Sequence, residues 1–333
     1  MFAISEGEAE NFFGGALPSS FSDAAVIRIP AGELADAGRF RTLLQRVRPD
    51  VLVSCWSTPP LPAEWIAGEG CPLRYVCHLT GSVRNVVPRR FLERGGLVTN
   101  WGGLVAFDVA EHALLLALAA LRNMNAWRPY VEAAEGEAVS WIDFIRPRPL
   151  RGCRVGIHGF GRIARALVKL LKPFDVRISA FSEGVPHAMM QEAGAEPCDS
   201  LEALFGRSDI LFECEALTPR TERSVDARAL AALPDGAVFV NIGRGRLVEE
   251  TALLREARSG RLSLALDVLS DEPLRKESPF YRLPNVVLSP HIAGPTASRL
   301  AECGAQALRN VRAFLEGRAP ESVVTLSAYD MST

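Results

Sequence analysis

The sequence has no long apolar run, no block of like charge and no paired-cysteine motif. Its longest apolar run, residues 113–121, is far shorter than the roughly 20 residues needed to cross a bilayer. The net charge at pH 7 is −2, and no stretch concentrates one sign, which argues against a nucleic-acid or membrane-surface partner. The segment 1–6 has no basic start before an apolar run, so we expect no secretory signal. We therefore expect a cytoplasmic protein with neither a nucleic-acid nor a membrane partner.

Seven cysteines are scattered along the chain, and no Cys-x-x-Cys pair or Cys/His ligand spacing is present. An odd number at irregular intervals is typical of reduced, mostly buried thiols. None of the seven stands in a recognisable nucleophile setting. We therefore expect no metal site and no catalytic cysteine.

Length and rhythm indicate two α/β domains. A chain of 333 residues with 48% hydrophobic residues can bury two separate cores. Short β-rich runs alternate with helical patterns, which is typical of parallel βαβ units. A long helix is predicted over 108–121, an irregular stretch over 122–149, and a C-terminal helix over 296–315 that packs on the first domain. The predicted strands are 24–29, 51–55, 73–77 and 97–99, followed by 153–157, 176–181, 209–213, 237–241, 263–267 and 286–289.

A glycine-rich turn lies between the strand predicted at 153–157 and an amphipathic helix. Residues 159–164 read Gly-Phe-Gly-Arg-Ile-Ala, a Gly-x-Gly-x-x-Ala pattern. Gly159 permits the tight turn, Gly161 lets the backbone approach a pyrophosphate, and Ala164 lets the helix pack closely on the strand. The free N–H groups of the first helical turn, including those of Arg162 and Ile163, would face the phosphates. This context predicts a dinucleotide site.

Polar residues at later strand ends bear on the choice of cofactor. An acidic residue that binds the ribose hydroxyls is expected about twenty residues after the turn, but the chain has Ser182 followed by Glu183. Glu183 would repel a 2′-phosphate and no arginine follows to hold one, so we favour NAD over NADP. Glu213 and Glu215 share one face of a later strand end, where they either hydrogen-bond the adenosine ribose or are simply solvated. His158 is interpreted as a strand-end filler.

Three further segments follow the glycine turn in the order and approximate spacing of a known family. They read Asn-Ile-Gly-Arg-Gly at 241–245, Leu-Asp-Val-Leu-Ser-Asp-Glu-Pro at 266–273 and Ser-Pro-His-Ile-Ala-Gly at 289–294. Together with 159–164 they resemble the signatures of the D-isomer-specific 2-hydroxyacid dehydrogenases. Upstream, Thr-Gly-Ser-Val at 80–83 is similar to that family's substrate loop, and 109–114 to its interdomain helix. The resemblance is specific for the family and not for one substrate.

The chemistry of such a reaction assigns roles to three residues. Arg244 suits the substrate carboxylate, because a guanidinium can bind it and also polarise the keto oxygen. His291 suits proton transfer, because an imidazole can protonate the developing alkoxide or remove the alcohol proton in reverse. Glu272 is expected to pair with His291, orient its ring and raise its pKa.

The resemblance implies further binding residues. Asp267 matches the position that holds the nicotinamide carboxamide. Backbone N–H groups around Gly81 and Ser82 would complete the carboxylate site. The remaining positions expected to bind the cofactor are Ser182, Glu215, Ile242, Gly243 and Gly294.

The resemblance also implies an architecture and an activity. We expect two doubly wound parallel-sheet domains: a Rossmann cofactor domain over 103–292, and a flavodoxin-like substrate-binding domain formed by 1–102 and 293–333. The stretch 127–149 is similar to the arm through which such domains pair, so we expect a homodimer. The expected reaction moves a hydride between NAD(H) and a small 2-hydroxy or 2-keto acid. The candidates are a D-2-hydroxyacid dehydrogenase, a glyoxylate/hydroxypyruvate reductase and a phosphoglycerate dehydrogenase-like enzyme.

Two alternatives remain open. A non-catalytic NAD(H)-sensing regulator could use the same fold, since a related group uses it as a corepressor scaffold, although this chain has no long tails with docking motifs. A dehydrogenase of a bulkier or non-acid substrate is the other alternative, because the segments 56–60 and 212–216 and Trp101 leave room for it.

Overall fold

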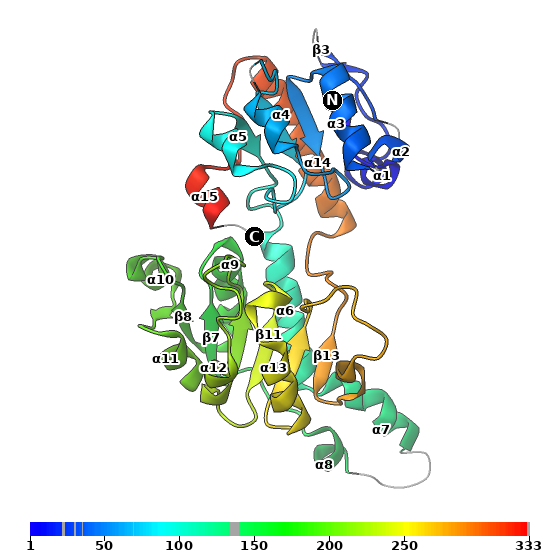
Figure 1. Ribbon diagram of the computed structural model, residues 1–333. Coiled ribbons are helices and arrows are strands. Elements are labelled where there is room, and N and C mark those ends of the chain that lie inside the picture. Colours follow the sequence, from blue (N-terminus) through cyan, green and yellow to red (C-terminus); the bar gives the residue numbers. More distant parts are fainter. Residues whose placement is uncertain (22–23, 30, 35, 69, 134–139, 332–333) are drawn as a thin grey trace. The chain divides into compact units, whose positions relative to one another are not determined.

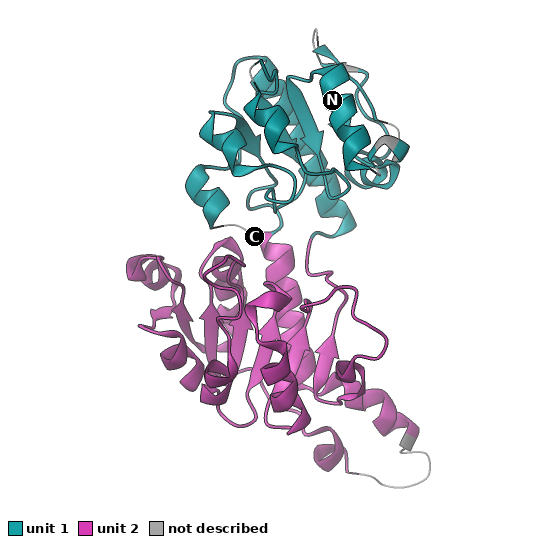
Figure 2. Cartoon of the chain, viewed as in Figure 1, with its two compact units in different colours: residues 1–105, 295–333 teal, residues 106–294 magenta. Residues whose placement is uncertain are grey.

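The computed structural model divides the chain into two compact units, which Figures 1 and 2 show in the same view. One unit comprises residues 1–105 and 295–333, and the other comprises residues 106–294. The boundaries between the units were expected after residues 102 and 292, and the structure places them after residues 105 and 294. The structure describes residues 1–21, 24–29, 31–34, 36–68, 70–133 and 140–331.

The unit formed by residues 106–294 contains a seven-stranded sheet. Its order is β13-β12-β11-β10-β7-β8-β9, and every pairing is parallel. This is the doubly wound order, in which the chain reverses direction across the sheet beside its first strand. The six strands predicted here are confirmed, whereas β9 has two residues and was missed. The strands are β7 (Arg154–His158), β8 (Arg177–Phe181), β9 (Glu196–Pro197), β10 (Ile210–Glu213), β11 (Val238–Asn241), β12 (Ser263–Leu266) and β13 (Val286–Leu288).

Helices cover both faces of this sheet. Successive strand residues point to opposite faces, so each strand contributes to two separate cores. Phe212 and Val240 belong to one core, and Leu211 and Phe239 belong to the other. The first core contains α6 (Ala106–Leu121), α9 (Arg162–Leu171) and α10 (His187–Ala193). The second contains α11 (Leu201–Gly206), α12 (Ala227–Ala232) and α13 (Glu250–Arg258). Both faces of the strands are therefore buried, as is usual in parallel sheets.

Short helical turns complete this unit. The stretch expected to be irregular contains η1 (Met124–Ala126), α7 (Trp127–Ala133) and α8 (Trp141–Ile145). The other turns are η2 (Lys172–Phe174), η3 (Gly245–Leu247) and η4 (Pro279–Arg282). Across the described ranges of both units, no helix is both long and apolar enough to cross a membrane.

The other unit is built on a four-stranded parallel sheet of order β1-β4-β5-β6. Phe2 also forms a parallel bridge with Arg28, which places the segment before Ile29 beside β1 in the flavodoxin-like order. The strand predicted over 24–29 is wrong as a continuous strand, because Ala24 and Ala25 pair antiparallel with residues 20–21 instead. The strands are β1 (Phe2–Ala3), β2 (Ser20–Phe21), β3 (Ala24–Ala25), β4 (Val51–Ser54), β5 (Tyr75–His78) and β6 (Leu97–Thr99).

The last long helix packs inside this first unit, as predicted. It is α14 (Ala297–Leu315), and it contacts α1 (Glu6–Phe13) and β5. The approach is very close at Gly304, where an added Cβ would lie 1.9 Å from the Phe12 carbonyl oxygen. The remaining helices of the unit are α2 (Ala31–Leu34), α3 (Ala37–Val47), α4 (Ala63–Ala67), α5 (Arg89–Glu93) and α15 (Leu326–Asp330).

Candidate active site

The three residues predicted to be catalytic follow three neighbouring strands of the seven-stranded sheet. Arg244 follows β11, Glu272 follows β12 and His291 follows β13. Parallel neighbours bring their carboxyl ends to one edge of the sheet, where α/β proteins bind ligands. His291 Nδ1 lies 2.6 Å from Glu272 Oε2. With an ionised glutamate, Nδ1–H donates this bond and Nε2 is the nitrogen left for a reacting oxygen.

Arg244 is half-buried under the influence of the same carboxylate. Burial lowers the pKa of the guanidinium, and the Glu272 charge opposes that shift. Since the pKa of an arginine ordinarily lies far above neutral, the guanidinium keeps its charge at pH 7. Its Nη1 donates to the Gly243 carbonyl at 2.7 Å, which fixes part of the fork close to its own backbone.

A close backbone contact at Gly245 holds the Arg244 turn against the Glu272 loop. A Cβ at Gly245 would lie 1.9 Å from the Leu269 carbonyl carbon. The Leu269 N–H in turn donates to Glu272 Oε1 at 2.9 Å. The glutamate is therefore held at both oxygens. Gly245 is not among the predicted site residues, although a glycine on each side of the arginine was a readable signal.

Asp267, at the end of β12, is buried and fully engaged with its surroundings. Its Oδ1 accepts from the Ser289 hydroxyl at 2.5 Å and lies 3.4 Å from His112 Nε2 of α6. Burial alone would raise the pKa of this carboxyl. Hydrogen bonds, led by those of His112 and Ser289, outweigh burial and lower the pKa to about 2. Asp267 is therefore a permanent anion inside the unit.

The same carboxylate holds the turn that carries His291. Backbone N–H groups of Ile292 and Ala293 donate to Oδ1 and Oδ2 of Asp267, both at 2.9 Å, and the His291 N–H donates to the Asp267 carbonyl at 2.9 Å. His291 itself has φ 55°, a left-handed conformation that a residue with a Cβ rarely adopts. Three hydrogen bonds to one aspartate stabilise that conformation. Gly294, the last predicted cofactor residue, follows directly and ends the unit.

The glycine turn after β7 has the shape that a dinucleotide requires. Gly159 has φ 87°, and a Cβ there would lie 2.4 Å from the Glu215 nitrogen, so only glycine fits. Gly161 is exposed, and a Cβ there would meet no described atom within 4 Å, so a ligand can approach its backbone. The helix α9 begins at the next residue, and the N–H groups of Arg162 and Ile163 open toward this space. The chain therefore fits a pyrophosphate here.

The polar residues beside this turn differ from the prediction. Ser182 Oγ donates to Glu215 Oε2 at 2.7 Å. Glu183 forms an exposed ion pair with Arg220, so an arginine distant in the sequence is near the position where none was expected. Because Arg220 neutralises it, the charge of Glu183 is a weaker argument against a 2′-phosphate than the sequence suggested.

Two interpretations of strand-end residues are wrong. Glu213 is 0% exposed, so it is not solvated and does not face a ribose. Its Oε2 lies 2.6 Å from His158 Nδ1. His158 is therefore paired with a buried carboxylate and does more than occupy space at the strand end. Periodicity could not show this, because the two residues are 55 positions apart.

Two other predicted cofactor positions lie between β11 and the arginine. Ile242 is buried, and its N–H donates to the Glu213 carbonyl at 3.2 Å. The Gly243 N–H donates to the Asn241 side chain at 3.0 Å, and a Cβ at Gly243 would lie 3.1 Å from the Glu215 carbonyl oxygen. This segment therefore packs on the backbone of the Glu215 loop.

The predicted substrate loop belongs to the other unit, where it follows β5. The Gly81 carbonyl accepts from the Asn100 side chain at 2.7 Å, and a Cβ at Gly81 would lie 2.7 Å from Nε1 of Trp101. Ser82 is half-buried. His78 stands just before the loop, with its ring nitrogens bonded to the Ser54 and Thr80 hydroxyls at 2.9 and 2.6 Å. Burial lowers the pKa of His78 to about 4, so a neutral ring supports the loop.

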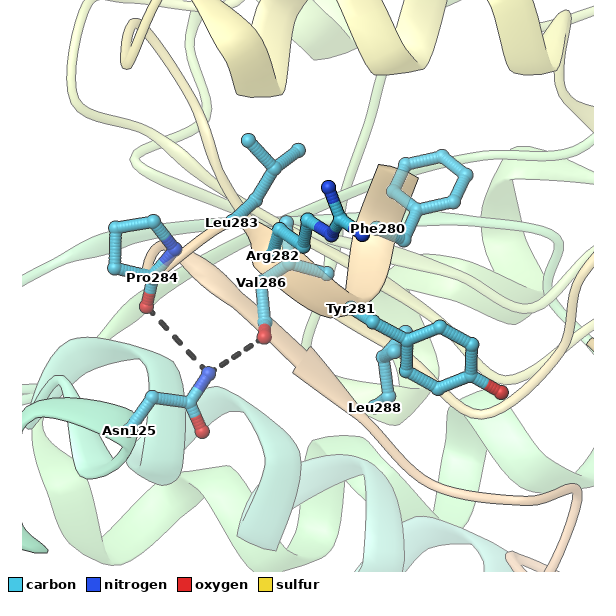
Figure 3. A pocket seen from close by; sticks show the side chains of 8 residues that line it. All are labelled: Asn125, Phe280, Tyr281, Arg282, Leu283, Pro284, Val286 and Leu288. Carbon is cyan, nitrogen blue, oxygen red and sulfur yellow. Dashed lines mark hydrogen bonds between the residues drawn. The ribbon is translucent and has the colours of Figure 1, made fainter. Parts of the chain in front are cut away.

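A cavity of about 460 Å³ is lined by residues other than those predicted for the site (Figure 3). Asn125 of η1 points toward it and donates to the Pro284 and Val286 carbonyls at 3.5 and 2.6 Å. Val286 begins β13, whereas His291 follows its end. The cavity lining includes residues of β13 but none of the three residues predicted to be catalytic. Its lining residues are Asn125, Phe280, Tyr281, Arg282, Leu283, Pro284, Val286 and Leu288.

Comparison with known proteins agrees with this geometry. A family model described as the NAD-binding domain of D-isomer-specific 2-hydroxyacid dehydrogenases matches residues 114–293. Glyoxylate reductase of Aeropyrum pernix is 31% identical over 297 residues, covering 86% of this chain and 86% of that protein. A solved protein of Thermus thermophilus has a TM-score of 0.74 at 28% identity, covering 90% of this chain and 91% of that one. A glyoxylate reductase of Paecilomyes thermophila has a TM-score of 0.74 at 25% identity, covering 86% and 88%.

These matches span both units and not only the cofactor-binding fold. The prediction of two parallel-sheet α/β units is confirmed by the strand order and by the solved neighbours. The enzymatic assignment is confirmed by the relatives, which are named glyoxylate reductase and phosphoglycerate dehydrogenase. The chain belongs to the D-isomer-specific 2-hydroxyacid dehydrogenase family and is an NAD(P)-type oxidoreductase that acts on the hydroxyl group of 2-hydroxy acids.

Proposed function

We propose that this enzyme reduces a small 2-keto acid with NADH, with Arg244, His291 and Glu272 as its catalytic residues. The observation that carries the proposal is the 2.6 Å bond between His291 and Glu272, with Arg244 in the field of the same carboxylate. All three stand on neighbouring strand ends of one unit. Glyoxylate is the first substrate to test, because the relatives of similar length are named for it.

Each residue has a distinct task in this proposal. Arg244 binds the substrate carboxylate and draws electron density toward the keto oxygen. The imidazolium of His291 donates its Nε2 proton to that oxygen as C2 is reduced, and the neutral ring takes the proton back in the oxidative direction. Glu272 fixes the tautomer and stabilises the charged ring. The bound dinucleotide supplies the hydride in one direction and accepts it in the other.

Four other residues complete the proposed site. Gly81 and Ser82 contribute backbone N–H donors to the substrate carboxylate. Asp267 holds the nicotinamide carboxamide, and its bonds to the backbone at Ile292 and Ala293 support this placement by fixing the adjacent turn. NAD is preferred over NADP because a second carboxylate, Glu215, stands beside Ser182 where the ribose hydroxyls are expected.

The test is reduction of glyoxylate, hydroxypyruvate and pyruvate, each assayed with NADH and with NADPH. His291→Gln is expected to lower kcat by roughly 10²–10⁴-fold, because general acid–base catalysis contributes about that factor. His187→Gln changes an exposed histidine of α10 and is the matched control. Equal activity of the His291 variant and the control would refute the assigned role. Activity confined to NADPH would refute the cofactor assignment.

We further propose a cytoplasmic homodimer in which residues 1–102 and 293–333 bind the substrate and residues 103–292 bind the cofactor. All seven cysteines are free, which supports a reducing compartment. Of the arm expected at 127–149, residues 134–139 lie outside the described part. The helices on either side of that gap expose a set of apolar side chains that supports pairing through this arm. They are Trp127, Val131, Trp141, Ile142 and Phe144. Light scattering of the purified protein tests the dimer.

A further inference from the structure

A buried ion pair lies directly beneath the glycine turn and takes no part in the catalytic triad. His158 ends β7 and Glu213 ends β10, and the two residues stand opposite each other in the sheet. Their side chains are 5% and 0% exposed. Burial works against a charged His158, but the Glu213 carboxylate raises its pKa. Central parallel strands are normally apolar, and charges are buried there at a cost in stability. A pair in this place therefore needs an explanation.

The pair is connected to Glu215 by hydrogen bonds. The second oxygen of Glu213, Oε1, accepts from the Glu215 N–H at 2.9 Å. The Glu215 side chain accepts from Ser182 Oγ at 2.7 Å and from the Ala216 N–H at 2.9 Å. The buried pair therefore holds the backbone of Glu215, and Ser182, just after β8, holds its carboxylate.

Glu215 also touches the phosphate-binding turn. The space beside Gly159 is filled by the backbone of residues 214–215, at 2.4 Å from the place of a Cβ. The Glu215 carboxylate therefore lies between the glycine turn and the end of β8, where a dinucleotide fold needs an acid for the adenosine ribose. Ser182 occupies the usual acidic position and uses its hydroxyl to hold this carboxylate.

We infer that Glu215 is the group that selects NAD(H) over NADP(H), and that His158 and Glu213 are positioning residues that fix it in place. This inference rests on the proposed function in that NAD(H) is the preferred cofactor, and it is independent of the keto acid. The Glu215 carboxylate accepts hydrogen bonds from the 2′- and 3′-hydroxyls of the adenosine ribose. A 2′-phosphate would be repelled by the negative charge of Glu215. The carboxylate could not move away, because the buried pair fixes the Glu215 backbone.

The experiment measures nucleotide affinity in the absence of any keto acid. Calorimetric titration with ADP-ribose and with its 2′-phosphate reports the adenosine end alone, and titration of NADH and NADPH by nicotinamide fluorescence reports the whole cofactor. Glu215→Gln keeps the size of the side chain and removes its charge. We expect it to lower the ratio of NADH to NADPH affinity by about tenfold or more, since hydrogen bonds to charged groups are worth that much.

The matched control is Glu196→Gln, which removes an exposed carboxylate of β9 that pairs with Arg207. We expect its affinity ratio to stay within about twofold of the wild-type ratio, because exposed ion pairs contribute little. A change in ratio for the Glu196 variant together with no change for the Glu215 variant would overturn the assignment.

A double variant separates positioning from stability. Replacing a buried pair by apolar residues is often neutral for folding, so His158→Leu with Glu213→Leu is expected to unfold near the wild-type temperature. It nevertheless loses the acceptor for the Glu215 N–H, so we expect the affinity ratio to fall about fivefold. Glu213→Gln, which preserves volume and an acceptor oxygen, is expected to retain more of the ratio. A merely structural pair would lower the unfolding temperature in single variants and leave every ratio unchanged.

Because no keto acid is present, the two proposals fail separately. Unchanged ratios in an enzyme that reduces glyoxylate would overturn this inference alone. Altered ratios in a protein that reduces none of the three acids would uphold it and remove the proposed substrate class.

Discussion

The close contact at Gly245 offers a sharp test of how the proposed catalytic groups are positioned. In the Gly245→Ala variant the new Cβ would lie 1.9 Å from the Leu269 carbonyl carbon, 2.1 Å from its oxygen and 2.3 Å from the Ser270 nitrogen. All three are backbone atoms, so no side-chain rotation relieves the overlap. Real Cβ atoms essentially never approach another atom within 3.0 Å, so the two segments must separate by roughly 1 Å. That separation moves Arg244 away from the loop that carries Glu272.

Catalysis should suffer far more than cofactor binding. A misplacement of about 1 Å can cost roughly 10²-fold in rate, so we expect kcat/KM for the keto acid to fall by about that factor or more. Affinity for NADH should change by less than about threefold in Kd, because the glycine turn follows a different strand; this corresponds to under about 0.7 kcal/mol. Overpacking should also cost about 1–3 kcal/mol of stability.

The assay compares steady-state kinetics, NADH titration and urea unfolding for the variant and for a matched control. Gly206→Ala adds a Cβ at the end of α11, 3.8 Å from the Ala232 carbonyl oxygen, which is an ordinary contact. It should leave activity unchanged. If Gly245→Ala keeps kcat/KM within about threefold of wild type, the backbone contact does not position the arginine and the reasoning is wrong.

Three further predictions concern stability and assembly. Gly304→Ala should lower the thermal unfolding temperature sharply, since its Cβ would overlap the Phe12 carbonyl, whereas Gly7→Ala in open space should not; equal melting curves would contradict this packing. Asp267→Asn should lose about 2 kcal/mol at pH 7, because the folded pKa is about 2 against 3.8. This contribution is present above about pH 4 and is lost as pH falls toward 2, so urea midpoints of variant and wild type should converge there; a constant gap would refute it. Trp141→Glu should convert the expected dimer to monomer in light scattering, because Trp141 is 51% exposed on the proposed arm, and an unchanged mass would exclude that arm.

The sequence predicted the strands that periodicity can report. All six longer strands of the cofactor unit were found because each is a run of apolar residues between turn signals. The two-residue strands β1 and β9 lie at or near sheet edges and are too short to show a pattern. The segment 24–29 has strand-like composition, but its first residues pair locally, and it meets β1 only later, through Ile27 and Arg28. Which strand a segment pairs with depends on tertiary structure and cannot be read from its composition.

The candidate site was predictable where one local motif carries one role. The signatures around Arg244, Glu272 and His291 singled out these residues, and the strand order explains why they follow neighbouring strands at one edge of the sheet. The contacts that hold them were not predictable, because they join segments distant in the chain. Gly245 against Leu269 is such a contact.

The hydrogen bonds of Asp267 have a consequence for how the end of its unit is held in place. The chain passes from one unit to the other at residues 294/295, only a few residues beyond His291. The carboxylate of Asp267 accepts hydrogen bonds from the backbone of Ile292 and Ala293, which lie between His291 and that connection. The position of the His291 turn is therefore set within its own unit and does not depend on the residues that follow Gly294.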